Sequence, residues 1–182
     1  MKWMIASDVH GSAYYCQKLI TRYTEEKADR LILLGDLLYH GPRNDLPRKY
    51  APKQVIEMLN KIKDDLLCVR GNCEAEVDQM VLSFPVMADY ALLNLGTRVL
   101  FITHGHIYNE ENLPPLKKGD VLLNGHTHIR KMEDKGDYYY INPGSVSLPK
   151  NGQVGSYIIL EENIFITKDL NGKTLETLEI GT

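Results

Sequence analysis

The sequence predicts an α/β fold in which two β-sheets face each other with helices outside them. Three observations lead to this prediction. Continuous apolar runs alternate with helical spacing in the first half of the chain, turn-separated strand-like segments fill the second half, and no linker, repeat or low-complexity tract divides the two halves. Buried strands joined by helices are typical of parallel βαβ units. We therefore expect the chain to form one domain, residues 1–182.

The first half supplies the parallel strands and their helices. Residues 2–7, 30–34 and 66–69 are short apolar runs, each of which predicts a buried strand. Residues 13–27 and 54–62 carry apolar side chains three or four positions apart, and this spacing predicts amphipathic helices. The order strand, helix, strand, helix, strand is that of two βαβ units.

The second half is expected to be mostly β-structure. Turn sequences rich in Gly, Asn and Asp occur at 94–97, 134–137 and 171–173, between or just after strand-like segments. The expected strands are 90–95, 98–103, 121–124, 138–142, 156–160 and 164–168. We expect these strands to form a second, mixed or antiparallel sheet that faces the first.

Composition and charge exclude several classes of function. The hydrophobic fraction of 43% and the charged fraction of 25% are those of an ordinary globular protein. A net charge of -3 counts against a nucleic-acid polymer or an anionic membrane as partner, because both usually require a basic face. No segment approaches the roughly 20 apolar residues that cross a bilayer.

The start of the chain and its cysteines indicate a cytoplasmic protein. The apolar run at residues 1–8 is too short for a signal peptide and ends in aspartate. Cys16, Cys68 and Cys73 are an odd number without CxxC spacing, so neither a disulfide framework nor a zinc knuckle is indicated.

Side chains that bind metals follow the ends of successive apolar runs. The ordered candidates are Asp8, His10, Asp36, Asn72, His104, His126 and His128. Mixed nitrogen and oxygen donors suit Mn²⁺, Fe²⁺, Co²⁺, Ni²⁺ or Zn²⁺ rather than Ca²⁺. Seven donors exceed the needs of one ion, but with one bridging carboxylate they suffice for two ions about 3.5–4 Å apart. Glycines beside these positions would allow positive φ and close backbone approach.

Each piece has an ordinary explanation when taken alone. DxH at 8–10 can be a turn aspartate beside a surface histidine, and the GD and GN pairs are common turn dipeptides. HxH at 126–128 can be a hydrogen-bonded polar pair. The ordered set contains four of the six histidines of the chain, however, and separate explanations would be needed for every position. A dinuclear metal site accounts for all of them.

This motif order resembles the calcineurin-like metallophosphoesterase superfamily. The series is DxH, GD, GN, a histidine followed by glycine, and GHTH. Within the superfamily, the small size, the segment 35–45 (GDLLYHGPRND) and the segment 142–145 (NPGS) resemble the bacterial YfcE-type phosphodiesterases. The resemblance implies an αββα sandwich of two mixed sheets flanked by helices, with the metals at the strand ends.

The resemblance also implies roles for individual residues. Asp8, His10, Asp36 and His128 would hold one ion, while Asp36 would bridge to a second ion held by Asn72, His104 and His126. The family often uses Mn²⁺ in assays, so the resemblance implies two divalent ions, Mn²⁺ first, with Fe, Zn, Co or Ni as alternatives. The implied reaction is hydrolysis of small organic phosphodiesters by a dimetal-bound hydroxide. A homodimer or homotetramer is also implied.

Asp36, Asn72, Cys73 and Arg43 are the residues expected to take part in catalysis. Arg43 could hold a phosphate oxygen through its guanidinium, or it could simply pair with Asp45. His40, in the same loop, is either an exposed loop residue or a substrate contact.

The chain departs from the superfamily pattern at two positions. Cys73 stands where the superfamily has the histidine that protonates the leaving oxygen, and Tyr39 stands where that histidine's Asp or His partner is common. Nearby cations should favour a thiolate, which has no proton to donate. Loss of a general acid costs about 10²–10⁴-fold on a leaving group that needs it. We therefore expect a preference for activated, aryl leaving groups.

Other polar residues near the motifs could have either a structural or a functional role. Glu74 is expected to start the next helix or to line the rim, and His106 to be structural or to support a ligand. Asn142 and Ser145 are expected in a turn that supports the site and could lie near substrate. Residues 138–140, three tyrosines, should alternate between faces of a strand rather than form a base-stacking platform.

Two further functions remain open on this scaffold. One is a phosphomonoesterase or nucleotidase, which the motifs do not separate from a diesterase. The other is a non-catalytic scaffold, the role of one retromer subunit that has this fold and a degraded metal site. All seven expected ligands are present here, which favours an enzyme.

Overall fold

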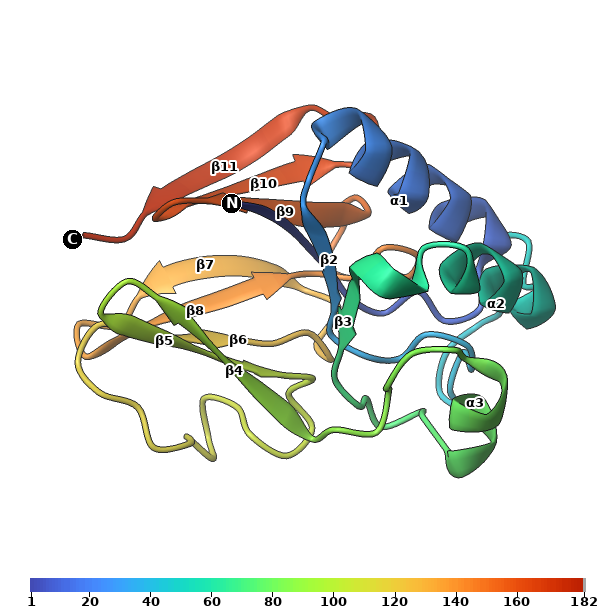
Figure 1. Ribbon diagram of the computed structural model, residues 1–182, viewed down its shortest axis with the longest axis horizontal. Helices are drawn as coiled ribbons and strands as arrows, with labels where there is room; N and C mark the ends of the chain where they lie inside the picture. Colours follow the sequence, from blue (N-terminus) through green and yellow to red (C-terminus); the bar gives the residue numbers. More distant parts are fainter. Residues whose placement is uncertain (182) are drawn as a thin grey trace.

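Two mixed β-sheets pack face to face in the computed structural model, which describes residues 1–181 (Figure 1). Thr182, the last residue of the predicted domain, lies outside the described range. The first sheet has the order β11 (Thr174–Glu179), β10 (Ile164–Asp169), β9 (Ser156–Glu161), β1 (Lys2–Ala6), β2 (Arg30–Leu33) and β3 (Leu66–Cys68). The second has the order β4 (Tyr90–Leu95), β5 (Arg98–Thr103), β6 (Asp120–Leu123), β8 (Tyr138–Pro143) and β7 (Arg130–Asp134).

Each sheet contains three neighbouring parallel strands. Strands β1, β2 and β3 are parallel at one edge of the first sheet, as the βαβ pattern predicts, and β5, β6 and β8 are parallel in the middle of the second sheet. The remaining strands pair antiparallel, all on the β1 side in the first sheet and one at each edge of the second. The predicted two-sheet sandwich is therefore confirmed.

The prediction placed β9 and β10 in the wrong sheet. Both were expected in the second sheet, but β9 pairs antiparallel with β1 and extends the first. The burial of β9 explains this position. Tyr157 and Ile159 pack on the helix side, while Ile158 and Leu160 pack between the sheets, so the strand is covered on both faces. Strands β7 and β11 were not predicted, and the short helix α3 (Glu76–Val81) begins two residues after Glu74, the residue considered as its start.

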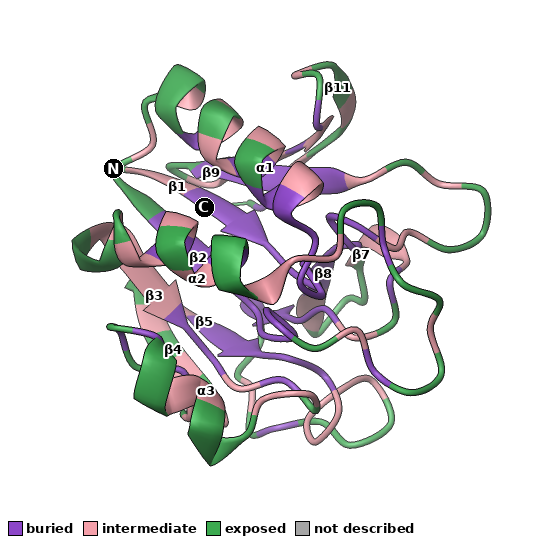
Figure 2. Ribbon diagram, turned by 90° about the vertical axis from the view of Figure 1, so that its right-hand side faces the viewer, coloured by how far each residue is buried: buried purple, intermediate pink, exposed green. Residues whose placement is uncertain are grey.

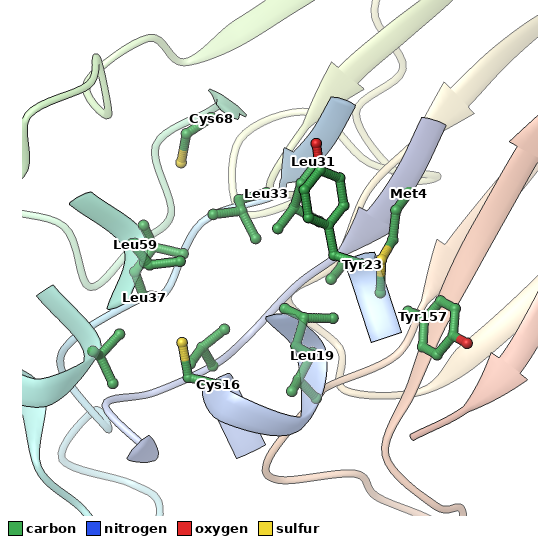
Figure 3. Close-up of a cluster of buried hydrophobic side chains, with 14 of the residues drawn as sticks. Met4, Cys16, Leu19, Tyr23, Leu31, Leu33, Leu37, Leu59, Cys68 and Tyr157 are labelled. Atoms are coloured by element: carbon green, nitrogen blue, oxygen red, sulfur yellow. The ribbon is translucent and has the colours of Figure 1, made fainter. Parts of the chain in front are cut away.

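Two helices cover the outer face of the first sheet. Helix α1 (Ala13–Glu26) begins at Ser12, whose hydroxyl accepts a hydrogen bond from the Tyr15 amide, and α2 (Pro52–Asn60) begins with proline at its first position. Their apolar sides pack on strand residues such as Met4 and Leu33 (Figure 3). The outward sides of both helices are exposed, whereas the strands beneath them are buried (Figure 2). None of the described helices has the length and apolar character needed to span a bilayer.

The outer face of the second sheet is covered differently. Phe101, Leu122 and Tyr140 form a small cluster there, against which Tyr108 and Leu116 of the segment 104–119 pack. This segment contains no helix. The helices of the sandwich that cover a sheet face thus lie on the first sheet.

Three tyrosines in β8 alternate as expected. Tyr138 and Tyr140 lie on the outer face, and Tyr139 packs on the core between the sheets. The three rings therefore belong to two layers of packing and do not form a stacking platform.

Glu26 ties the end of α1 to the first sheet. Lys168 Nζ lies 2.8 and 3.0 Å from its two carboxylate oxygens, and the Tyr157 hydroxyl donates to it at 2.8 Å. Burial raises the pKa of Glu26, but these hydrogen bonds outweigh burial and hold the pKa below its ordinary value. The carboxylate therefore contributes stability above pH 4.5, and this contribution is lost as the pH falls through the lowered pKa.

Glu26→Gln is expected to lower the free energy of unfolding by about 1–2 kcal/mol at pH 7, since two charge-assisted hydrogen bonds are weakened. Urea denaturation at pH 7 and in steps below pH 4.5 measures the effect. The difference in free energy of unfolding between the variant and wild type should become smaller as the pH falls. Glu25→Gln on the same helix is the control, because Glu25 is exposed and should change stability by under about 0.5 kcal/mol. A difference for Glu26→Gln that persists unchanged at low pH would contradict the assignment.

Candidate metal centre

The loops that follow five strands bring the predicted ligands together. Asp8 and His10 follow β1, Asp36 follows β2, and Asn72 follows β3 of the first sheet. His104 follows β5 of the second sheet, and the pair His126 and His128 follows β6. Contacts between these side chains join the two sheets at one end of the sandwich.

One group of ligand atoms surrounds Asp8. Its Oδ1 lies 3.4 Å from His10 Nε2 and 3.2 Å from His128 Nε2, and the two ring nitrogens are 3.0 Å apart. All three side chains are buried. The other oxygen of Asp8 accepts a hydrogen bond from the His126 amide at 3.1 Å.

A second group surrounds His104. Its Nε2 lies 3.5 Å from Asp36 Oδ2, 3.1 Å from Asn72 Oδ1 and 3.2 Å from His126 Nδ1. Asp36 Oδ2 is also 3.7 Å from His10 Nε2, so this carboxylate lies between the two groups. A bridging role of Asp36 between two ions stays a prediction, and its carboxylate lies within 4 Å of a ligand atom of each group.

The hydrogen bonds of three histidines turn their free ring nitrogens toward the centre. The Nδ1 atoms of His10, His104 and His128 lie 2.8, 2.6 and 2.7 Å from backbone carbonyl oxygens. A carbonyl only accepts, so each Nδ1 carries the hydrogen and each neutral Nε2 presents a lone pair. These lone pairs face one another and the oxygens of Asp8, Asp36 and Asn72.

The centre therefore has more acceptor atoms than hydrogen-bond donors. Asp8 Oδ1 is one of these acceptors, because it is buried and no donor contacts it. Lone pairs that converge in a buried site repel unless positive charge lies among them. Nitrogen and oxygen donors without thiolates suit first-row divalent ions. The residues present therefore fit a metal centre.

In the protein without metal, protons take the place of those cations. Burial lowers the pKa of His104, but its hydrogen bond to Asp36 and the charges of Asp8 and Asp36 raise it to about 9. The pKa of His10 is likewise raised by Asp8 against the effect of burial. Despite burial, the histidines hold the pKa values of Asp8 and Asp36 below the ordinary range. Burial and the charge of His104 lower the pKa of His126 to about 4.

Metal binding is expected to release protons near neutral pH. His104, with a pKa of about 9 in the metal-free protein, is protonated at pH 7, and a metal must displace that proton to reach Nε2. The apparent affinity should rise between pH 6.5 and 8 by up to about tenfold per unit. Calorimetric titration of Mn²⁺ in buffers of different ionisation enthalpy measures the protons released. His40→Gln is the control and should keep the pH dependence, whereas an affinity independent of pH would contradict the protonation of His104.

Five of the ligand residues have positive φ angles. The values are Asp8 59°, His10 49°, Asp36 54°, His126 64° and His128 62°. Non-glycine residues rarely adopt this conformation, and a cluster of them is a mark of a functional site.

Two of the neighbouring glycines are required because a side chain would collide with nearby atoms, and not because their φ angles are positive. A Cβ at Gly71 would collide with the Asp36 side chain, and one at Gly125 would collide with Ser7. Gly11, Gly35 and Gly105, by contrast, do have positive φ, as the motif pattern predicts.

The position predicted for Glu74 was wrong. Helix α3 begins two residues later, at Glu76, and the Glu74 carboxylate turns inward. It accepts hydrogen bonds from the backbone amides of Asp36 (2.8 Å), Leu37 (2.7 Å) and Gly71 (2.5 Å). Glu74 thereby holds the GD loop against the GN loop, and no motif spacing reveals such a contact between a side chain and two loops.

The NPGS turn supports the centre from below. The Asn142 side chain donates to the Gly125 carbonyl at 2.8 Å, and the Ser145 hydroxyl donates to the Asp8 carbonyl at 2.8 Å. Both residues are fully buried, so they position ligand loops and do not contact substrate. The supporting role predicted for this turn is thus observed.

A pocket of about 410 Å³ opens over the candidate ligands. Its lining includes Asp36, Asn72, Cys73, His126 and His128, and it also includes Arg43, Thr127 and Lys150. Within residues 1–181 no ion pair joins Arg43 to Asp45, so the pairing considered as an alternative is not found. Lys150 was missed in the sequence, because a lysine in a turn carries no motif signal. An apolar cavity of about 330 Å³ at the opposite ends of β1–β3 has none of the ligands in its lining.

Two other histidines lie beside the centre without joining it. The ring of His40 packs edge-on against Tyr39 and Tyr50 and is not part of the pocket lining. His106 lies with its ring centre 5.4 Å from that of His104.

Cys73 faces the pocket from the GN loop. Its Sγ belongs to a group with His10 and Asp36 in which ligand atoms lie within 4.8 Å of one another. The side-chain amide of Asn72 donates a hydrogen bond from Nδ2 to this Sγ at 3.3 Å. Burial, and then the charge of Asp36, raise the pKa of the thiol in the metal-free protein. Bound cations act in the opposite direction. Since a thiol of high pKa is a weak acid and a thiolate is none, both forms are poor proton donors.

The fold and the centre define the family. The family model described as the Calcineurin-like phosphoesterase superfamily domain matches residues 1–163, and the chain belongs to this superfamily.

Among curated proteins, the chain is 45% identical to "Phosphodiesterase YfcE" of Escherichia coli K12 over 175 residues, which cover 96% of this chain and 95% of the relative. A solved structure described as YfcE, a phosphoesterase from E. coli, superposes with a TM-score of 0.96 at 43% identity and full coverage of both chains. Vps29 of Entamoeba histolytica shares the fold alone, at 18% identity and a TM-score of 0.65 over the full length of both chains.

Proposed function

We propose that the protein is a metal-dependent phosphodiesterase that hydrolyses small organic phosphodiesters and favours activated, aryl leaving groups. The observation that carries the proposal is the convergence of three Nε2 lone pairs on Asp8, Asp36 and Asn72 in a buried centre. The similarity to a phosphodiesterase over 96% of the chain supports the choice of a diester over other phosphate esters.

The ligands divide between two ions around Asp36. Asp8, His10 and His128 would hold one ion together with Asp36, and Asn72, His104 and His126 would hold the other with it. The nitrogen and oxygen donors of this set are compatible with Mn²⁺, the ion that we propose, and also with Fe, Zn, Co and Ni. When bound, the ions would activate water as a nucleophile at neutral pH and would neutralise charge on the phosphoryl oxygens.

The chain itself orients the substrate and sets the choice of leaving group. Arg43, which lines the pocket, is placed to hold a phosphate oxygen through its planar guanidinium. Asn72 presents its amide oxygen to the centre. Cys73 occupies the position of a general acid without serving as one, so the departing oxygen must leave without a proton from this residue.

Matched aryl esters test the proposal directly. Protein reconstituted with Mn²⁺ is assayed on 4-nitrophenyl phosphate and bis(4-nitrophenyl) phosphate, and the diester should have the higher kcat/KM. A series of aryl methyl phosphates with leaving groups of increasing pKa should then show a steep fall in kcat. A higher kcat/KM on the monoester would favour the phosphomonoesterase. A kcat that does not depend on leaving-group pKa would contradict the hypothesis that the site lacks a general acid at Cys73.

A non-catalytic scaffold is the second candidate because Vps29 has the same fold. The intact set of seven candidate ligands, five of them buried, argues against it. Failure of the purified protein to bind Mn²⁺ or Zn²⁺ in equilibrium dialysis would restore the scaffold hypothesis.

A further inference from the structure

Two cationic side chains in the lining of the pocket have no acidic partner. Arg43 lies in the loop after β2, and Lys150 lies in the turn after β8. Both are exposed, and within residues 1–181 neither side chain forms an ion pair or a hydrogen bond. The lysine is the less expected of the two, since no motif includes it.

The two cations come from different loops of the pocket lining. Gly41, two residues before Arg43, lies against Cys73, because a Cβ at this glycine would be 3.4 Å from Sγ. The Lys150 amide donates instead to the His128 carbonyl at 3.1 Å. A tight turn with Asn151 at φ 54° and a hydrogen bond back to the Lys150 carbonyl fixes this backbone. Lys150 is therefore anchored to the GHTH loop, whereas Arg43 belongs to the loop that lies against Cys73.

The charges of the pocket exceed what a simple diester can neutralise. The candidate ligands include two carboxylates, Asp8 and Asp36, so two divalent ions together with a hydroxide nucleophile would leave a net charge of about +1. A phosphodiester carries one negative charge, and Arg43 would already share it. Lys150 then remains as a free cation in a pocket of 410 Å³, the size of a small-molecule site.

We propose that Lys150 binds a second anionic group of the substrate, a carboxylate or a phosphate carried by the part of the diester that does not leave. This inference rests on the proposed phosphodiesterase function. The anion belongs on the retained part because a negative charge near the departing oxygen would raise the pKa of the leaving alcohol. That effect would oppose a site without a general acid at Cys73. The substrate class is therefore a small diester with a further negative charge.

Two esters that differ only in this charge test the inference. They are 4-nitrophenyl butyl phosphate and 4-nitrophenyl 3-carboxypropyl phosphate, which share their leaving group and chain length. The carboxylate ester should have a kcat/KM about tenfold higher, mainly through KM, since one charge-assisted contact is gained. In Lys150→Met the ratio of the two kcat/KM values should fall toward one, and Lys150→Arg should preserve it. Lys118→Met, an exposed lysine outside the pocket, is the matched control and should leave the ratio unchanged.

Binding without turnover gives a second readout. Propylphosphonate and 3-phosphonopropanoate differ by the same exchange of methyl for carboxylate, and neither is a substrate for phosphoester hydrolysis. Calorimetry on the Mn²⁺-reconstituted protein should show about tenfold tighter binding of 3-phosphonopropanoate. This preference should weaken with added salt and disappear in Lys150→Met.

The outcomes separate this inference from the proposed function. Equal kcat/KM for the two esters in wild type overturns the inference and leaves the diesterase intact. A preference that survives in Lys150→Met also overturns it, because the anion then binds elsewhere. If no diester is hydrolysed, the proposed function fails, and the phosphonate comparison still decides whether Lys150 holds a second anion.

Discussion

Asp36→Asn should lower kcat/KM for bis(4-nitrophenyl) phosphate by at least about 10³-fold, or about 4 kcal/mol of transition-state stabilisation. Asp36 Oδ2 lies between His10 and His104, and its Oδ1 accepts a hydrogen bond from the Cys73 amide at 2.9 Å. The substitution keeps the size of the side chain but removes the charge shared by both groups of ligands. We expect weaker binding of both ions rather than of one alone.

Metal content and activity should fall together in this variant. Elemental analysis after reconstitution with Mn²⁺ gives the number of ions per chain, and the assay is repeated at saturating Mn²⁺. Asp45→Asn is the matched control, since Asp45 is an exposed acid of the same loop outside the pocket lining and should change kcat/KM by under about twofold. An Asp36→Asn protein with two bound ions and near-normal turnover would show that another group forms the bridge.

The ligand positions could be predicted from the sequence because each follows the end of a strand. In parallel units such ends meet at one edge, so the order of Asp8, Asp36 and Asn72 along the chain already implies their proximity. His104 and His126 follow the same rule in the second sheet. The prediction required only that strands end where apolar runs end, and this held within one residue or two for these five elements.

The assignment of strands to sheets could not be predicted in the same way. An apolar run indicates burial but not the neighbour that buries it, and β9 offers the same pattern to either sheet. β7 escaped notice for the opposite reason, because Met132 is the single apolar residue among its five. Long-range pairing, such as Lys2 of β1 with Glu161 of β9, decides these cases and leaves no local signal.

Residues that support the site were hidden for a similar reason. Glu74 accepts three backbone amides from two loops, and Ser145 reaches the Asp8 carbonyl across 137 positions of sequence. Such contacts depend on how the loops stack rather than on residue type. The ligands of a metal site have residue types that a sequence motif reveals. The residues that hold the ligand loops in place have types that are common in any turn, so no motif reveals them.

Cys73→His should raise kcat on alkyl phosphodiesters by about 10²-fold, the lower end of what a general acid contributes. The histidine would enter the pocket from the position of Cys73, close to Asp36 and beside Gly41, and could carry a proton to the departing oxygen. Aryl esters with acidic leaving groups need no such help and should gain little. The dependence of kcat on leaving-group pKa should therefore become shallower.

The residue at position 39, where the superfamily often has the partner of the acid histidine, limits how much Cys73→His raises kcat on alkyl phosphodiesters. Tyr39 is 43% exposed and packs edge-on against His40, so it offers the new imidazole no carboxylate. Tyr39→Asp combined with Cys73→His should exceed the single variant, because an acidic partner orients the ring and raises its pKa. Cys73→Ser is the control and should keep the steep leaving-group dependence of wild type. If Cys73→His binds Mn²⁺ normally and alkyl diesters gain nothing, the absence of a general acid is not what limits this enzyme.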